Sequence, residues 1–228
     1  MFEAVLLLII GSDYFGLLAE PYFIRQNWTC IMNRLNGIMG SVDYMKKRGM
    51  EEDMQKYVES KVRDIVDFPK KGIVFRDITT AVKDPKALKF MVDFLTEQYE
   101  DKKIDYVVGI ESRGFIFGAP LAYNLGAGFV VVRKPGKLPA DVVSQEYSLE
   151  YGTDKIEMHA DAIEEGKNVL VVDDLLATGG TVDAACKLLK KVGANIVGAA
   201  FIIELSDLKG REKLEGVDVV SMIQYKGL

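Results

Sequence analysis

The sequence is poor in the residues that most metal sites and many hydrolases use. Its 228 residues include two cysteines, Cys30 and Cys186, and a single histidine, His159. The cysteines lie far apart and form no C-x-x-C spacing, so we predict two free thiols in a reducing, cytoplasmic setting. One histidine excludes a multi-histidine zinc site. A serine triad would require His159, and no G-x-S-x-G motif accompanies it.

A block of like charge is also missing. The 29 Lys and Arg residues are interspersed with 34 Asp and Glu residues, and the net charge is −5. Because a general nucleic-acid binder usually shows a basic face, we predict no nucleic-acid partner. Apolar residues make up 49% and charged residues 28%, which is ordinary for a globular protein. The length suits one domain with an appendage or two small domains.

The start of the chain lacks the features of a signal peptide and of a membrane span. Its apolar run, Val5 to Ile10, follows Glu3 rather than a basic residue. A span needs about 20 apolar residues, and Asp13 and Glu20 interrupt this stretch. We therefore predict no membrane partner. A weak membrane-surface anchor stays open as the alternative.

We predict that residues 1–53 are an N-terminal extension outside the working domain, which comprises residues 54–228. An upstream start codon would explain the extension. The alternative starting residues are Met39, Met45, Met50 and Met54.

Helical and strand patterns alternate from Met54 onward. Apolar residues recur at helical spacing between Ala87 and Tyr99, behind Asp84 as N-cap and Pro85 at the first helical position. Short apolar runs separated by helices predict an α/β fold, a Rossmann-like parallel sheet flanked by helices. Ligands of such sheets bind at the carboxyl ends of the strands. The expected helices cover residues 54–66, 87–99, 119–125 and 182–192, and the expected strands cover 106–110, 129–132, 169–172 and 196–203.

The most informative segment runs from Asn168 to Thr181. Its apolar strand is followed by Asp173 and Asp174, and then by a glycine-bearing loop that leads into a helix. Such a loop can present several backbone N–H groups to a phosphate. It is not a Walker A loop, because G-x-x-x-x-G-K is missing. The two carboxylates would repel phosphate, so we expect them to face ribose hydroxyls or a hydrated Mg²⁺. Helix capping would explain neither the second acid nor the paired glycines.

This segment resembles the signature for 5-phosphoribosyl-1-pyrophosphate (PRPP) in type I phosphoribosyltransferases. The form Asp-Asp-Leu-Leu-Ala-Thr-Gly-Gly-Thr resembles the adenine-specific branch of that family, and the likeness runs from about Met54 to the C-terminus. The resemblance implies a glycosyltransferase of purine salvage, a pentosyltransferase that joins adenine to PRPP and releases AMP and pyrophosphate. The other stretches that agree are residues 68–79, 111–115, 133–139 and 147–152.

By this resemblance, Ala177 to Thr181 would hold the 5′-phosphate of PRPP. Asp173 and Asp174 would face the ribose and the waters of a Mg²⁺ ion that PRPP carries, with no direct protein ligand assigned to the metal. A non-proline cis peptide is expected near Glu111-Ser112. The implied PRPP-binding residues are Ser112, Arg113, Arg133, Lys134, Asp173, Asp174, Ala177, Thr178, Gly179, Gly180 and Thr181.

The resemblance also implies a small N-terminal hood over the base and a flexible loop over PRPP. Val74, Phe75 and Arg76 would lie near adenine, although core packing explains Phe75 equally well from the sequence alone. The implied catalytic residues are Glu150, which would move a proton at N7 of the purine, Tyr151, which would cap the closed loop, and Arg113, which would stabilise the departing pyrophosphate.

Members of this family are typically homodimers, which we carry over as an expectation. Residues 208–214 are expected to form a solvated charged helix without a catalytic role. Two other functions stay open. One is an enzyme of the same fold that acts on guanine, hypoxanthine or xanthine, and the other is a PRPP sensor without activity. The adenine-type loop and the hood disfavour the first, and the lack of a DNA-binding pattern in the first fifty residues disfavours the second.

Overall fold

The computed structural model describes residues 47–148 and 152–226 of the chain. The chain divides into two compact units, Met1–Asp53 and Met54–Leu228. Most of the first unit lies outside the described residues, so the extension over residues 1–53 stays a prediction. The second unit contains the three β-sheets of the described chain. Within the described residues, no helix is long and apolar enough to cross a membrane.

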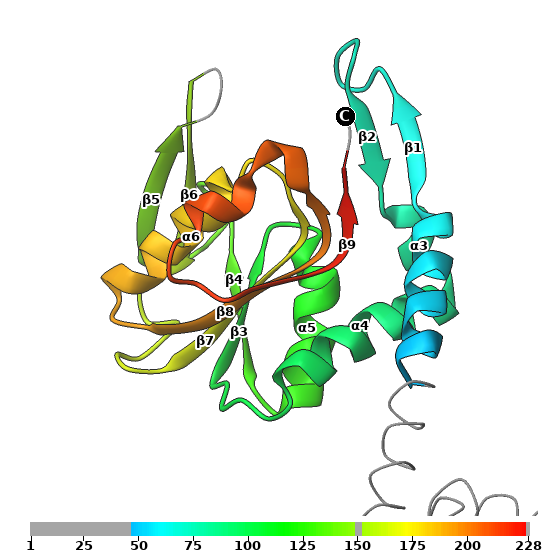
Figure 1. Ribbon diagram of the computed structural model, residues 1–228. Helices are drawn as coiled ribbons and strands as arrows, with labels where there is room; N and C mark the ends of the chain where they lie inside the picture. The colour runs from blue at the N-terminus through cyan, green and yellow to red at the C-terminus, as the bar shows by residue number, and fades with distance from the viewer. Residues whose placement is uncertain (1–46, 149–151, 227–228) are drawn as a thin grey trace, which may run out of the picture. The chain divides into compact units, whose positions relative to one another are not determined.

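A five-stranded sheet forms the centre of the second unit (Figure 1). Its order is β4-β3-β7-β8-β9, and each neighbouring pair is parallel. The predicted parallel sheet is therefore confirmed. The edge strand β9 was not predicted, because Ser221 and Gln224 interrupt its apolar pattern. The strands are β3 (Tyr106–Ile110), β4 (Gly128–Val132), β7 (Asn168–Leu176), β8 (Asn195–Leu205) and β9 (Val219–Tyr225).

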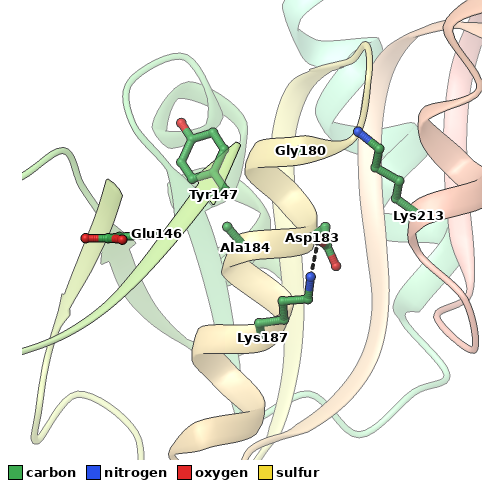
Figure 2. A pocket seen from close by; sticks show the side chains of 7 residues that line it. All are labelled: Glu146, Tyr147, Gly180, Asp183, Ala184, Lys187 and Lys213. Atoms are coloured by element: carbon green, nitrogen blue, oxygen red, sulfur yellow. Dashed lines mark hydrogen bonds and ion pairs between the residues drawn. The ribbon is translucent and has the colours of Figure 1, made fainter. Parts of the chain in front are cut away.

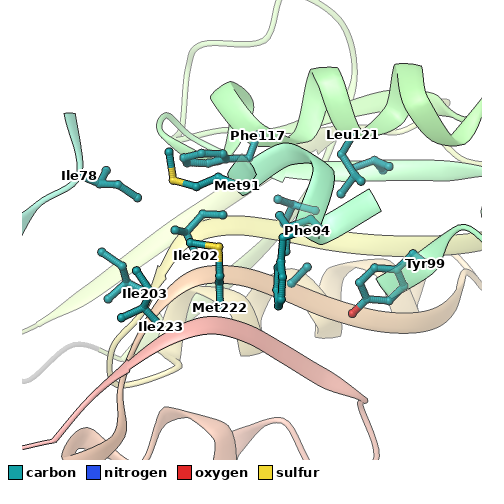
Figure 3. Packing of buried hydrophobic residues seen from close by; sticks show 14 of the residues in the cluster. Ile78, Met91, Phe94, Tyr99, Phe117, Leu121, Ile202, Ile203, Met222 and Ile223 are labelled. Carbon is teal, nitrogen blue, oxygen red and sulfur yellow. The ribbon is translucent and has the colours of Figure 1, made fainter. Parts of the chain in front are cut away.

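Two apolar clusters pack on opposite faces of this sheet. Successive side chains of a strand point to opposite faces, so Leu170 and Val172 belong to one cluster and Val169 and Val171 to the other. Figure 3 shows the first cluster, in which side chains of α4 (Pro85–Tyr99) and α5 (Gly114–Leu125) meet the sheet. The second cluster joins the sheet to α6 (Gly180–Lys191) and to β6 (Thr153–His159). The helices thus cover both faces, which explains the continuous apolar strands.

The helix boundaries agree with the sequence where capping residues mark them. The Asp84 carboxylate accepts hydrogen bonds from the backbone N–H groups of Lys86 and Ala87, each 3.0 Å long, at the start of α4. Gly126 ends α5 with φ 64°, a left-handed conformation that favours glycine. The start of α5 was predicted five residues too late. Gly114 and Gly118 weaken the helical pattern, and packing against the sheet overrides that weakness.

Two antiparallel hairpins accompany the central sheet, and both correct the sequence prediction. The helix expected over residues 54–66 ends at residue 61, because β1 (Arg63–Val66) pairs with β2 (Val74–Asp77). This pair forms the predicted hood, followed by α3 (Thr79–Val82). The flexible loop expected over PRPP is flanked by two paired strands, β5 (Val142–Ser148) and β6, and residues 149–151 between them lie outside the described residues. In both cases, antiparallel pairing between two strands gives the segment a regular structure that the local sequence did not predict.

The prediction of a charged helix over residues 208–214 is wrong. This segment instead forms two 3-10 turns, η2 (Ser206–Leu208) and η3 (Gly210–Lys213). Gly210 and Leu214 are buried, and the Arg211 guanidinium pairs with buried Glu204. Gly210 and Leu214 therefore pack against the domain, while the charged side chains are exposed as expected, namely Lys209, Arg211, Glu212 and Lys213.

Candidate active site

The two acidic residues of the signature lie within strand β7, not in the loop after it. The strand continues to Leu176, and Asp173 pairs with Phe201 of β8. Asp174 is only 4% exposed, and its carboxylate accepts a hydrogen bond from Arg113. The predicted strand end at Val172 was wrong because polar Asp173 and Asp174 break the apolar run, while the backbone pairing with β8 continues through them.

A glycine brings Arg113 to this pair of acids. An added Cβ at Gly114 would lie 2.6 Å from the carbonyl oxygen of Val172, so only glycine allows α5 to begin so close to β7. The start of α5 therefore sets Arg113 beside Asp174, although the two residues are 61 positions apart in the sequence.

Asp173 and Asp174 lie close together, and a single cation, Arg113, faces both of them. Burial, and then repulsion from Asp174, raise the pKa of Asp173 well above its ordinary value. Burial lowers the pKa of the Arg113 guanidinium, but the hydrogen bond to Asp174 and the attraction of Asp174, Asp173 and Asp77 together outweigh burial and raise that pKa. One guanidinium thus faces two carboxyl groups. A further cation with its own water shell fits this pair of oxygen ligands, although no group of three or more metal-ligating side chains occurs among the described residues.

The loop from Ala177 to Thr181 leads directly from β7 into α6. Gly179 is its turning point, with φ 77°, and is buried. No side chain caps the N-terminus of α6. The first backbone N–H groups of a helix have no partner within the helix, and such N–H groups bind phosphate well. The structure thus brings Ala177, Thr178, Gly179, Gly180 and Thr181 together as one candidate anion loop.

A second group of polar side chains surrounds the loop after β3. The peptide between Glu111 and Ser112 is cis, as expected. Glu111 accepts hydrogen bonds from Arg133 at 3.2 Å and from the side chain of Lys137. Because Arg133 and Lys137 share the single carboxylate of Glu111, this group of three side chains keeps a net positive charge.

Lys134 lies between two residues of the β5–β6 hairpin. Its Nζ donates to the Tyr147 hydroxyl at 3.0 Å and forms an ion pair with Asp154. Burial opposes the charge of Lys134, but the hydrogen bonds to Asp154 and Tyr147 outweigh it and raise the pKa of the lysine. The Tyr147 hydroxyl is also 3.5 Å from Oγ1 of Thr181. Tyr147 thus lies between the candidate anion loop and Lys134.

The three predicted adenine residues lie on β2 of the hood. Phe75 is half-buried and makes an edge contact with Phe68, with ring centroids 5.4 Å apart. The Arg113 guanidinium lies 6.0 Å from the Phe75 ring. Arg76 pairs with Asp64 and stacks on Tyr225, 4.3 Å from the ring centroid. Phe75 therefore faces the candidate site, whereas Arg76 is engaged within the domain. The third residue, Val74, pairs with Val66 in the hairpin.

An open cavity of about 260 Å³ lies beside the start of α6 (Figure 2). Within it, Asp183 and Lys187 form an ion pair of 2.7 Å, and the Lys213 side chain extends from η3 toward the start of the helix. The lining residues are Glu146, Tyr147, Gly180, Asp183, Ala184, Lys187 and Lys213.

The comparisons with known proteins agree with this geometry. The family model described as phosphoribosyl transferase domain matches residues 79–226. The adenine phosphoribosyltransferase of Nostoc punctiforme is 59% identical over 170 residues, which cover 74% of this chain and 99% of that protein. The chain belongs to the adenine phosphoribosyltransferase family. The member of this family from Clostridium perfringens is 56% identical over 168 residues, with 74% and 98% covered.

Solved structures of adenine phosphoribosyltransferases share the fold. That of Thermoanaerobacter pseudethanolicus superposes with a TM-score of 0.73 and is 51% identical, over 75% of this chain and 99% of that one. The Saccharomyces cerevisiae structure, a complex with an imino-altritol bisphosphate and adenine, has a TM-score of 0.71 and 40% identity, over 75% and 99% of the two chains. Nearly the whole length of each relative thus corresponds to about three quarters of this chain.

Several residues around the adenine phosphoribosyltransferase site were missed from the sequence. Tyr147 and Asp154 contact Lys134, and Lys137 contacts Glu111. Each belongs to a stretch that resembles the family, or borders one, but only the tertiary structure reveals the contacts. The predicted catalytic residues Glu150 and Tyr151 lie outside the described residues.

Proposed function

We propose that the protein transfers the 5-phosphoribosyl group from PRPP to adenine and releases AMP and pyrophosphate. One observation carries the proposal: an uncapped helix N-terminus behind a glycine loop lies next to the two acids of β7 and Arg113. A phosphate, a ribose and a pyrophosphate joined in one molecule would need these three kinds of partner in this order. The membership in the adenine phosphoribosyltransferase family supports adenine as the acceptor.

In this proposal, the loop from Ala177 to Thr181 binds the 5′-phosphate through backbone N–H groups and the threonine hydroxyls. Asp173 and Asp174 accept hydrogen bonds from the ribose. Mg²⁺ would reach the site on PRPP, and the unbalanced acid pair fits its water shell. When bound, the metal supplies positive charge to the pyrophosphate.

The cationic side chains act on the leaving group. Pyrophosphate departs from C1′ of the ribose, and N9 of adenine attacks from the opposite face. Arg113 and Lys134 stabilise the charge that develops on pyrophosphate, while Ser112 and Arg133 complete the binding of PRPP. Both Arg113 and Lys134 must exchange a protein carboxylate for the substrate, because each is ion-paired in this structure.

The base would bind under the hood, near Val74, Phe75 and Arg76. Phe75 offers a ring face of suitable size for a purine, next to Arg113. Glu150 would accept the proton from N7 of adenine as N9 bonds to C1′, and Tyr151 would cap the closed loop. Closure would exclude water, which could otherwise hydrolyse PRPP.

The assembly and setting of the enzyme are further parts of the proposal. We expect a homodimer in the cytoplasm, working in purine salvage. Ile116 and Tyr123 lie two turns apart on α5 and are 37% and 86% exposed. We place the contact between the two subunits on this face of α5. Sedimentation equilibrium would test the dimer, and a monomer at micromolar concentration would contradict it.

A base-selection assay tests the proposed reaction. The protein is incubated with Mg²⁺, PRPP and adenine, guanine, hypoxanthine or xanthine, and nucleotides are separated by chromatography. AMP should form faster than any other nucleotide by up to about 10⁴-fold, because buried polar groups stay unpaired with the wrong base. Equal rates with hypoxanthine would contradict adenine specificity, and binding of PRPP without turnover of any base would indicate a sensor.

A further inference from the structure

The backbone of η3 packs directly beneath the candidate anion loop. An added Cβ at Gly179 would lie 2.4 Å from the carbonyl oxygen of Gly210. In return, an added Cβ at Gly210 would lie 2.2 Å from the carbonyl oxygen of Ala177 and 2.9 Å from the Gly179 nitrogen. Both contacts involve backbone atoms, which cannot rotate away as a flexible side chain can. The two glycines therefore interlock, although 30 residues separate them.

The segment that carries Gly210 is itself firmly held. The Arg211 guanidinium donates to both carboxylate oxygens of Glu204, at 3.1 and 2.6 Å, and to the carbonyl oxygen of Val219 at 2.6 Å. Leu214 is 4% exposed and belongs to the apolar cluster that also contains Leu176. Because Arg211 and Leu214 hold the turn directly after Gly210, a side chain at position 210 would displace the loop rather than the turn.

We propose that Gly210 is a positioning residue, which sets the shape of the Ala177–Thr181 loop for the 5′-phosphate. The inference rests on the proposed function, in which this loop binds that phosphate. Gly210 touches no substrate; it acts through the backbone of Ala177 and Gly179. A helix N-terminus binds an anion only when its N–H groups converge, and a misplacement of about 1 Å can lower catalysis about 10²-fold. The close contact between the backbone of Gly210 and that of Ala177 and Gly179 would keep the N–H groups of the loop directed at one point.

The test uses two ligands that report on different ends of PRPP. Ribose 5-phosphate reports on the loop, and pyrophosphate with Mg²⁺ reports on the Arg113 and Lys134 side. Gly210→Ala should weaken binding of ribose 5-phosphate by about tenfold or more, while pyrophosphate binding matches that of the parent protein. Titration calorimetry measures both affinities, and thermal unfolding measures Tm in parallel.

Gly198→Ala is the matched control. An added Cβ at Gly198 would lie 3.0 Å from the Asp218 carbonyl oxygen and 3.0 Å from the Tyr99 hydroxyl, so it strains packing away from the loop. It should lower Tm without changing either affinity. If Gly210→Ala binds ribose 5-phosphate as the parent does, or loses both ligands equally, the inference is wrong.

A milder variant keeps the test decisive if Gly210→Ala does not fold. Arg211→Lys keeps the positive charge near Glu204 but loses the forked hydrogen bonds that anchor η3. It should weaken ribose 5-phosphate binding selectively, and unchanged binding in the folded variant would overturn the inference. A parent protein that binds neither ligand would overturn the proposed function, and this inference with it. Normal parent binding with no variant effect would overturn the inference alone.

Discussion

The two candidate anion-binding regions of this protein are built on different principles. The loop from Ala177 to Thr181 contains no cation and depends on backbone N–H groups, whose direction the packing against Gly210 sets. The region around Arg113 and Lys134 depends on charged side chains, and each cation is paired with a carboxylate. The first region is therefore preorganised, whereas the second must exchange partners when its ligand binds.

The largest effect should come from Arg113, since it joins the cationic region to the acid pair. Arg113→Met removes a charge directed at the departing pyrophosphate, so kcat/KM should fall by about 10²–10³-fold. Steady-state kinetics measure the loss, with Tm recorded because buried Asp174 loses its partner. Arg48→Met, at an exposed i,i+4 pair with Glu52, is the control and should be silent. A fall in kcat/KM of less than tenfold would mean that Arg113 does not stabilise the departing pyrophosphate.

Glu150 should act in proton transfer from adenine and should not affect the binding of phosphate or pyrophosphate. Glu150→Gln keeps the size of the side chain but cannot ionise, so kcat should fall by about 10²-fold. PRPP binding should stay as in the parent, which separates this variant from Asp173→Asn, where PRPP binding should weaken as well. Glu165→Gln is the exposed control. If Glu150→Gln turns over at the parent rate, Glu150 is not the proton acceptor, and the proton of adenine passes to water or to pyrophosphate.

The hood contains an ion pair between Arg63 and Asp77 that takes no part in ligand binding in this proposal. Hydrogen bonds from Thr79 and then from Arg63 lower the pKa of Asp77 to about 2. Because the pKa of Asp77 is lower in the folded protein than its ordinary value of 3.8, the ionised carboxylate stabilises the fold at pH values above 3.8. This stabilisation is lost as the pH falls from about 4 to about 2. Asp77→Asn should therefore lower the free energy of unfolding by about 2 kcal/mol at pH 7.

Urea denaturation at several pH values measures this difference. The gap between the parent and Asp77→Asn should narrow below about pH 4, since protonation of Asp77 removes the same charge. Asp161→Asn, at an exposed carboxylate, is the control and should show little change at any pH. A gap that is independent of pH would mean that Asp77 stabilises the hood without its charge.

Lys134 sharpens the comparison between the two anion regions. Lys134→Met removes a charge-assisted hydrogen bond, so pyrophosphate affinity should fall by about tenfold, while ribose 5-phosphate affinity stays unchanged. This is the reverse of the pattern expected for Gly210→Ala. Lys102→Met, which removes the surface partner of Asp218, is the control. Equal losses for both ligands would show that the two regions are not independent.

The smallest effect should come from the N-terminal extension, which lies outside both regions in the sequence prediction. A chain that begins at Met45 should keep the activity and solubility of the full chain. Activity and light scattering measure these two properties. A tenfold fall in kcat/KM, about 1.4 kcal/mol, would show that residues before Met45 belong to the working enzyme.

The sequence alone determined the parts of this protein that depend on neighbouring residues. Asp84 caps α4 as predicted, and the strands β3 and β4 match their apolar runs within one residue. The loop from Ala177 to Thr181 could be recognised because its glycines and threonines are contiguous, so one segment carries the whole pattern.

The tertiary structure decided everything that depends on contact between distant segments. No local pattern shows that Arg113 meets Asp174, that Lys134 meets Asp154, or that Gly210 supports Gly179. Nor could periodicity show that β5 pairs with β6, because the partner of a strand lies outside its own sequence. Hydrophobic spacing reports which face of an element is buried, while the identity of the neighbour depends on how the whole chain packs.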